Sequence, residues 1–392
     1  MRTLLLADSE FAGNEHALLS RLSIALAEAG ASPVLAMPER TSAGASEPAG
    51  VLCASQVGYD ARGSSFSLTG RVMQLLRALP DHIELSPARG EPGAVVHVFG
   101  RRVWKFARRL REETGTAMVF ELSRAADAEA LAAMLRHAVR DVPGAPLGVV
   151  SAGENILRRF QANAPGVLSA LARWGVNVKE PTPAGRAPGE MVSLGVLAPG
   201  GTDHDRGVRD IIEAAGILSA SRAELLVFLD SRGAAHHGVW RAARRRGVLD
   251  RLTLVSDVEQ RAEHFLQTTI LVVPERLGEC RSILLSAMAQ GCPIVARHDP
   301  DAEWLIDGTT AILADNPNCA TCPLGGRAWA DVIDGVLSNP ARVEQVRHSA
   351  REYVLENHSP LEYAESLLGV YRALIKQGTE QERATETSGT AR

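Results

Sequence analysis

The sequence predicts an α/β protein made of two doubly wound domains, each built on a parallel sheet. Short apolar runs rich in β-branched residues alternate along the chain with helical patterns of apolar residues. The chain has 392 residues, which is enough for two domains of ordinary size. A segment rich in Pro and Gly, KEPTPAGRAPGE at residues 179–190, has the composition of a linker and divides the chain near its middle.

The first half begins with a β–α–β unit. An apolar strand is followed by a polar loop from Asp8 and by a helix that ends at Gly30. The unit lacks the GxGxxG pattern of dinucleotide-binding folds, and Gly13 alone offers a close backbone approach. In this half we predict strands over residues 4–6, 33–37, 94–99, 119–122 and 147–151, and helices over residues 15–29, 72–79, 101–111, 125–139 and 154–161.

Two features of the first half have alternative interpretations. His97 lies inside the apolar strand 94–99, where a buried core histidine is favoured over a functional one. Residues 101–111 form a basic amphipathic helix with Trp104 and Phe106, a pattern that suits an anionic membrane surface. A domain helix with its apolar face in the core is the favoured interpretation, because the preceding strand needs a helix packed on it.

The second half repeats the alternation of strands and helices. We predict a disordered tail over residues 377–392, which lack large apolar side chains. The predicted strands are 192–196, 224–230, 252–255, 270–273, 293–296 and 311–313, and the predicted helices include 240–247, 263–268, 283–288, 329–337, 342–356 and 360–375.

One stretch of the second half, residues 274–296, is the best candidate for a binding site. Its polar loop, residues 275–282, lies between the carboxyl end of the strand 270–273 and the N-terminus of the helix 283–288. Ligands of open α/β sheets bind at such strand ends, and phosphates favour helix N-termini. An ordinary β–α connection is the alternative.

Composition excludes several classes of protein. The formal net charge of −4 gives no electrostatic basis for nucleic-acid binding. No apolar run approaches the roughly 20 residues that span a bilayer. The odd number of cysteines, five, favours a reducing cytoplasmic location. Cys319 and Cys322 form a lone CxxC that cannot complete a zinc site by itself, so loop cysteines are favoured over a metal or redox site.

The end of the candidate stretch resembles a known family. The segment AMAQGCPIVA, residues 287–296, is similar to the A-M-A-x-G-x-P-V-V-A motif of retaining glycosyltransferases of the GT-B fold, family four, also called glycosyl transferases group 1. The two acids of the family motif fall on Gly278 and Ser286, and Glu279 lies one position after the first of them. The basic pair that grips the donor diphosphate falls on Val196 and Arg206.

The resemblance implies a GT-B architecture, with two Rossmann-like domains facing a cleft. Residues 1–180 would be the acceptor domain, 190–358 the nucleotide-sugar donor domain, 359–376 a helix that crosses back to the first domain, and 377–392 the tail. The implied catalytic residue is Glu279. The implied donor-binding residues are Arg206, Gly207, Asp230, Arg281, Ser282 and Ser286, and Gly13 and His97 are placed on the acceptor side.

The implied activity is metal-independent, retaining transfer of a hexose from a nucleotide-sugar, without a cofactor. The acceptor would be a glycan, a lipid-linked molecule or a small molecule, in polysaccharide biosynthesis in the cytoplasm or at the inner face of the membrane, with peripheral contact through residues 101–111. A non-catalytic GT-B relative that binds a carbohydrate or a partner protein is the main alternative, because three charged family positions are replaced. An epimerase-like enzyme on the same fold is a third interpretation.

Overall fold

The chain forms two compact units, each built on one parallel sheet. The computed structural model describes residues 1–39, 55–60, 67–80, 83, 85, 94–141, 146–178, 191–198, 205–222, 224–234, 237–258, 261–314 and 324–389. The first unit consists of Met1–Gly175 and Pro360–Arg392, and the second of Val176–Ser359. The expected linker, residues 179–190, lies outside the described residues, and the division falls slightly earlier, after Gly175.

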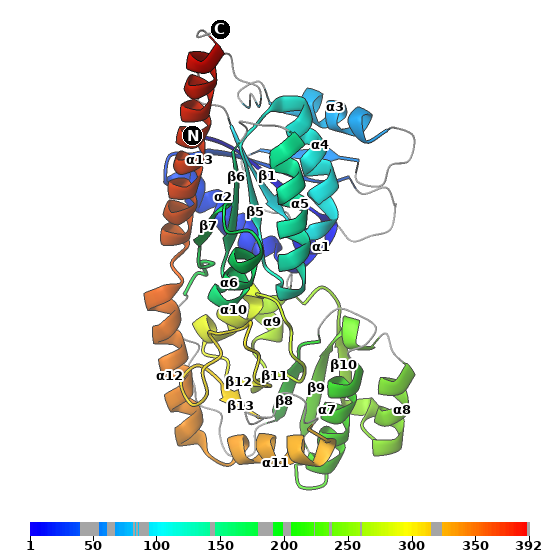
Figure 1. Cartoon of the computed structure of the whole chain (residues 1–392). Helices are drawn as coiled ribbons and strands as arrows, with labels where there is room; N and C mark the ends of the chain where they lie inside the picture. Colours follow the sequence, from blue (N-terminus) through cyan, green and yellow to red (C-terminus); the bar gives the residue numbers. More distant parts are fainter. Residues whose placement is uncertain are drawn as a thin grey trace. The chain divides into compact units, whose positions relative to one another are not determined.

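The first unit has a seven-stranded sheet with helices on its faces (Figure 1). The strand order β3-β2-β1-β4-β5-β6-β7 reverses between β1 and β4, and every neighbouring pair is parallel. The strands are β1 (Arg2–Ala7), β2 (Ser32–Pro38), β3 (Gln56–Tyr59), β4 (Val95–Phe99), β5 (Met118–Glu121), β6 (Leu147–Ser151) and β7 (Leu168–Leu171). The helices are α1 (Ser9–Asn14), α2 (His16–Glu28), α3 (Leu68–Ala78), α4 (Trp104–Thr114), α5 (Ala128–Asp141), α6 (Glu154–Asn163) and α13 (Pro360–Gly389).

The second unit has a six-stranded parallel sheet in the order β10-β9-β8-β11-β12-β13. Its core joins apolar residues of β8, β9 and α7 to Trp329 of α11. The strands are β8 (Val192–Val196), β9 (Leu225–Asp230), β10 (Leu252–Val255), β11 (Ile270–Val273), β12 (Ile294–Ala296) and β13 (Ile312–Leu313). The helices are α7 (Asp205–Leu218), α8 (His237–Arg246), α9 (Ala262–Phe265), α10 (Ser282–Gln290), α11 (Gly326–Leu337) and α12 (Pro340–Asn357). The predicted α/β class with two doubly wound parallel sheets is therefore confirmed.

Several details differ from the sequence prediction. The loop expected after Asp8 is helix α1, because the Asp8 carboxylate caps it by accepting a hydrogen bond from the Phe11 amide at 2.7 Å. The edge strand β7 was not predicted, since its four residues are only half-buried. Helix α13 continues to Gly389, so the expectation of a disordered tail from residue 377 is wrong for the backbone up to that point. Seven of the thirteen residues 377–389 that extend it are Glu, Gln, Arg or Ala, which are strong helix formers.

Helix α4 packs its apolar face into the first unit, which agrees with the favoured interpretation of residues 101–111 as a domain helix. Trp104 and Phe106 are buried in the first unit, so their rings cannot insert into a bilayer in this fold. On the polar side, Arg109 pairs with Glu112 and Glu113. None of the described helices has the length and apolar character needed to cross a bilayer.

His97 belongs to a buried polar network in the first unit. Its Nδ1 lies 2.7 Å from the Tyr371 hydroxyl, and its Nε2 lies 3.2 Å from Glu121 Oε2. Glu121 also accepts hydrogen bonds from Trp174 Nε1 at 2.8 Å and from the Tyr363 hydroxyl at 3.2 Å. All five side chains are buried. His97 is therefore a fully buried core histidine, and the predicted acceptor-side contact does not fit its position.

The tyrosines of this network fix the C-terminal helix to the sheet. Burial, together with the nearby Glu121 carboxylate, raises the pKa of the Tyr371 phenol well above its usual value. Tyr371 therefore keeps its proton and remains able to donate a hydrogen bond. Since Tyr363 and Tyr371 both lie on α13, the end of the chain is anchored inside the first unit.

We expect Glu121→Ala to lower the free energy of unfolding by about 3 kcal/mol, because it leaves several buried donors without an acceptor. Glu154→Ala is the control, since Glu154 pairs with Arg158 at an exposed site and should contribute at most about 0.5 kcal/mol. Urea unfolding followed by tryptophan fluorescence measures both variants. Equal losses in the two variants would contradict the role given to Glu121.

Candidate functional site

The carboxyl edge of the second sheet gathers most of the predicted site residues. Because its strands are parallel, the loops after β9, β11 and β12 leave the sheet at one edge, which is where ligands of open α/β sheets bind. Asp230 ends β9, the loop 274–281 follows β11, and Asp299 follows β12. These three segments build the candidate site.

A glycine lets the first turn of α7 approach the loop after β11. The Gly207 amide donates a hydrogen bond of 2.5 Å to Glu275 Oε1. A Cβ on residue 207 would lie 2.6 Å from this oxygen and 2.8 Å from the Pro274 carbonyl oxygen. The N-terminal turn of a helix favours anionic groups, and here the Glu275 carboxylate supplies one. The Gly207 amide therefore already has an internal carboxylate as its partner, and a contact of Gly207 with a donor phosphate stays a prediction.

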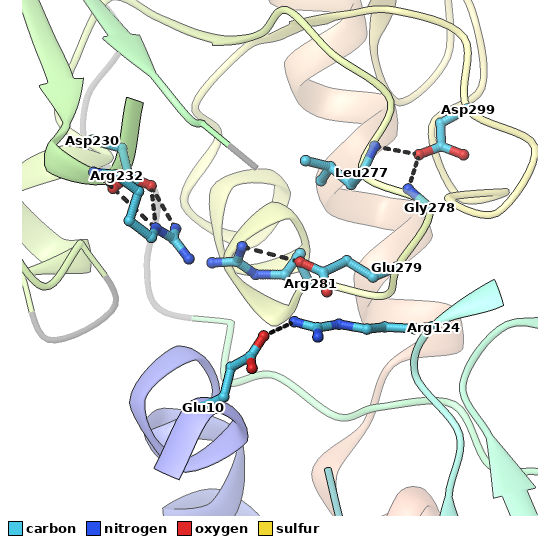
Figure 2. A network of polar contacts seen from close by, with 9 residues as sticks. All are labelled: Glu10, Arg124, Asp230, Arg232, Leu277, Gly278, Glu279, Arg281 and Asp299. Atoms are coloured by element: carbon cyan, nitrogen blue, oxygen red, sulfur yellow. Dashed lines mark hydrogen bonds and ion pairs between the residues drawn. The ribbon is translucent and has the colours of Figure 1, made fainter. Parts of the chain in front are cut away.

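Asp299 fixes the loop that carries the catalytic candidate (Figure 2). Its Oδ2 accepts hydrogen bonds from the Leu277 amide at 2.8 Å and the Gly278 amide at 2.9 Å. Gly278 has a φ of +59°, a left-handed conformation that glycine adopts without strain. Asp299 was missed by the sequence analysis, because a single aspartate after a strand carries no spacing signal.

Glu279 and Arg281 form a buried pair at the start of α10. Arg281 Nη1 lies 3.4 Å from Glu279 Oε1 (Figure 2). Arg281 is 1% exposed and Glu279 is 8% exposed. Arg281 is the N-cap residue of α10, where the helix dipole opposes a cation. The Glu279 carboxylate offsets this repulsion. The arginine and the amide groups of the helix N-terminus can together attract a further anion.

The Asp230 carboxylate is used inside the protein. Arg232 Nε lies 3.1 Å from Asp230 Oδ1, and Arg232 Nη2 lies 2.5 Å from Oδ2 (Figure 2). Asp230 is buried, whereas the Arg232 side chain is 28% exposed. Asp230 therefore orients an arginine that the sequence analysis missed, and Arg232 is the better placed of the two to meet a ligand.

The remaining predicted residues have less distinctive surroundings. Ser282 is buried as the first residue of α10, and Ser286 is half-buried one turn later. Arg206 is exposed in the first turn of α7, next to Gly207. Gly13 lies inside α1, and a Cβ there would meet no atom within 4 Å among the described residues, so its place on the acceptor side stays a prediction.

The first unit has its own charged group at the carboxyl ends of its central strands. Asp8 Oδ2 accepts a hydrogen bond from the Arg102 amide at 2.8 Å, and burial raises the pKa of the Asp8 carboxyl. Glu10 pairs with Arg102 at 2.8 Å and with Arg124 at 2.6 Å. This cluster was missed by the sequence analysis, because its members come from three separate connections.

No metal centre is evident in the described part of the chain, where no three His, Cys, Asp or Glu side chains are arranged to hold an ion. Cys319 and Cys322 lie outside the described residues.

Residues 194–334 match the family described as glycosyl transferases group 1. The match covers the sheet edge described above, including Arg206, Asp230 and the loop 274–281. The match lies within the second unit and is to the family that the sequence resemblance indicated. No curated protein sequence matches the chain.

Solved structures share the fold over nearly the whole chain. Sucrose-phosphate synthase from Thermosynechococcus elongatus is 16% identical, with a TM-score of 0.67 over 96% of this chain and 100% of that one. A glycosyltransferase from Rickettsia africae is 13% identical, with a TM-score of 0.65 over 96% of this chain and 98% of that one. Anabaena HepE in complex with UDP-glucose is 13% identical, with a TM-score of 0.66 over 95% of this chain and 100% of that one. The predicted GT-B fold is confirmed.

We expect Gly207→Ala to lower the free energy of unfolding by about 1–3 kcal/mol, because the new methyl group overlaps the Pro274 carbonyl. The control is Gly335→Ala on α11, where a Cβ meets no described atom within 4 Å. This control should be stabilised by about 0.5–1 kcal/mol, as for any glycine in an open helical position. Chemical unfolding measures both, and stabilisation by Gly207→Ala would contradict the close approach.

Asp210 on α7 should make stability depend on pH. Burial raises the pKa of Asp210 from 3.8 to about 6, although the guanidinium of Arg206 opposes the shift. The folded state therefore holds this proton more tightly than the unfolded state, and stability falls as the pH rises from about 4 to about 6. We expect Asp210→Asn to be more stable than the wild type above pH ~6 and equal to it below pH ~4.

Urea midpoints of wild type and variant across this pH range test the prediction. Asp331→Asn, at an exposed position of α11, is the control and should give no pH-dependent difference. A constant difference between Asp210→Asn and the wild type at all pH values would contradict it.

Proposed function

We propose that the chain is a retaining, metal-independent glycosyltransferase that moves a hexose from a nucleotide-sugar to a glycan, lipid-linked or small-molecule acceptor. The observation that carries the proposal is the buried pair of Glu279 and Arg281 at the N-terminus of α10, within the segment that matches group 1 glycosyltransferases. Group transfer from a nucleoside diphosphate needs stabilisation of the leaving diphosphate, and this helix end supplies it.

The donor diphosphate would contact Arg281 and the amide groups at the start of α10. Arg206 and Arg232 come from the neighbouring connections and add positive charge at the same sheet edge. Three guanidinium groups at this edge, two of them held by the Asp230 and Glu279 carboxylates, would donate hydrogen bonds to a diphosphate, which supports the metal-independent mechanism. Ser286, one turn into α10 and half-buried, would bond a ribose hydroxyl.

UDP is the first nucleotide to test. Anabaena HepE, which shares the fold, is known in complexes with UDP and with UDP-glucose. The proposal assigns the donor to the second unit and the acceptor to the first, where Glu10, Arg102 and Arg124 form the charged group at the strand ends. Retention of the anomeric configuration is proposed from the family resemblance, and polysaccharide biosynthesis in the cytoplasm is the proposed setting.

Glu279 would position the sugar through its hydroxyl groups. The carboxylate is buried and its loop is fixed by Asp299, so its location is held before substrate binds. In the proposed mechanism a bound donor loosens the contact between Glu279 and Arg281. Glu279 then contacts the sugar hydroxyl groups, and Arg281 contacts the diphosphate.

A non-catalytic relative is the second candidate. It is favoured by one observation, that Gly278 and Ser286 occupy the places of the two family acids while Glu279 is engaged with Arg281. Such a protein would bind a nucleotide-sugar or glycan without turning it over.

We expect Glu279→Gln to lower turnover of UDP-glucose at least about a hundredfold, and Arg281→Gln to weaken UDP binding about tenfold or more. Glu344→Gln, an exposed position on α12, is the control and should change neither quantity. UDP release in a coupled assay and titration calorimetry give the two readouts. UDP binding without turnover in the wild type, across a panel of acceptors, would support the non-catalytic candidate.

The anomeric configuration of the product, followed by NMR, tests retention separately. We expect an α-linked donor to give an α-linked product. A β-linked product would overturn the retaining mechanism and leave nucleotide-sugar binding intact.

A further inference from the structure

Helix α8 of the second unit carries a strongly basic exposed face. At 100° per residue, Trp240, Arg241, Arg244 and Arg245 fall within one half of the helix. All four side chains are exposed, and the opposite half, with Val239, Ala242 and Ala243, is buried. Figure 1 shows α8 beside α7 on the flank of the second unit.

The positive charge of this face is not neutralised within the described structure. Arg241, Arg244 and Arg245 form no ion pair with any residue that the structure describes, whereas Arg246 lies 3.5 Å from Glu213. Over residues 240–251 there are five arginines and one acid, in a chain whose net charge is −4. Helix α4 differs in this respect, since its Arg109 pairs with Glu112 and Glu113.

Large apolar side chains are exposed in the same segment. Trp240 is 37% exposed, and its indole Nε1 donates a hydrogen bond of 2.9 Å to the Ala234 carbonyl, which fixes the ring. Leu249, in the turn after α8, is 40% exposed, and Leu254, on the edge strand β10, is 43% exposed. Three of the nine exposed large hydrophobic residues described in the chain thus fall within residues 240–254.

We infer that the surface of residues 240–249 docks the second unit on an anionic lipid bilayer. Basic residues clustered on an amphipathic helix bind anionic lipids at about 1 kcal/mol each. Tryptophan favours the membrane interface, because its ring is apolar while its N–H is polar. Exposed Trp and Leu beside unpaired arginines favour a bilayer over a purely polyanionic partner such as a nucleic acid, which would need only the charges.

This surface is separate from the donor site. It lies on α8 and the following turn, whereas the residues assigned to the donor come from the first turn of α7, the end of β9 and the start of α10. Membrane docking therefore does not depend on the proposed catalytic function, and either can fail alone.

Co-sedimentation with vesicles tests the inference. We expect the full chain to bind vesicles of phosphatidylcholine and phosphatidylglycerol, to bind pure phosphatidylcholine much more weakly, and to be released by added salt. The triple variant R241Q/R244Q/R245Q should bind acidic vesicles roughly a hundredfold more weakly. W240A should bind acidic vesicles severalfold more weakly. In the wild type, the fluorescence of Trp240 should shift to the blue when the protein binds the vesicles.

The control variant is R108Q/R109Q, which removes the same kind of charge from the paired face of α4 and should leave vesicle binding unchanged. Circular dichroism of each variant confirms that it is folded. The inference is overturned by equal binding of the triple variant and the wild type, or by absence of binding to acidic vesicles. Binding of the same face to single-stranded DNA or to an acidic protein, without binding to lipid, would also overturn it.

Discussion

One buried carboxylate, Glu121, joins parts of the first unit that lie far apart in sequence. It contacts His97 of β4, Trp174 after β7 and Tyr363 of α13, and is itself the last residue of β5. A buried carboxylate such as Glu121 destabilises the fold unless its hydrogen-bond partners remain in place. The last helix of the chain is therefore part of the core of the first unit, which cannot be completed until the second unit has been synthesised.

The second unit uses carboxylates for a different purpose. Glu275 and Asp299 accept hydrogen bonds from backbone amides and hold the loop after β11, while Asp230 and Glu279 hold arginines. The arginines that Asp230 and Glu279 fix are the groups that the proposed stabilisation of a leaving diphosphate would use. The basic face of α8 adds a second, independent surface for anionic partners.

Much of the fold could be predicted from short signals. The buried runs at residues 4–6 and 270–273 identify central strands, and Gly291 ends α10 in a left-handed conformation that glycine favours, with a φ of +71°. Helix α1 was missed because its six residues have no apolar periodicity, and its Asp8 cap is recognised only once the strand end is known. Arg232 and Asp299 were missed because their roles depend on distances between loops, which the sequence does not contain. The favoured interpretation of His97 as a core residue is correct, because a polar residue inside an apolar strand usually has buried partners.

The central claim is that the second unit binds a nucleoside diphosphate, and a thermal-shift panel of UDP, GDP, ADP and CMP tests it most directly. A ligand at 100 times its dissociation constant adds about 2.7 kcal/mol to the stability of the folded state, which raises the unfolding temperature by several degrees. The account predicts such a shift with one nucleoside diphosphate, UDP being the first candidate, and its loss in Arg281→Gln. No shift with any of the four nucleotides would contradict the claim.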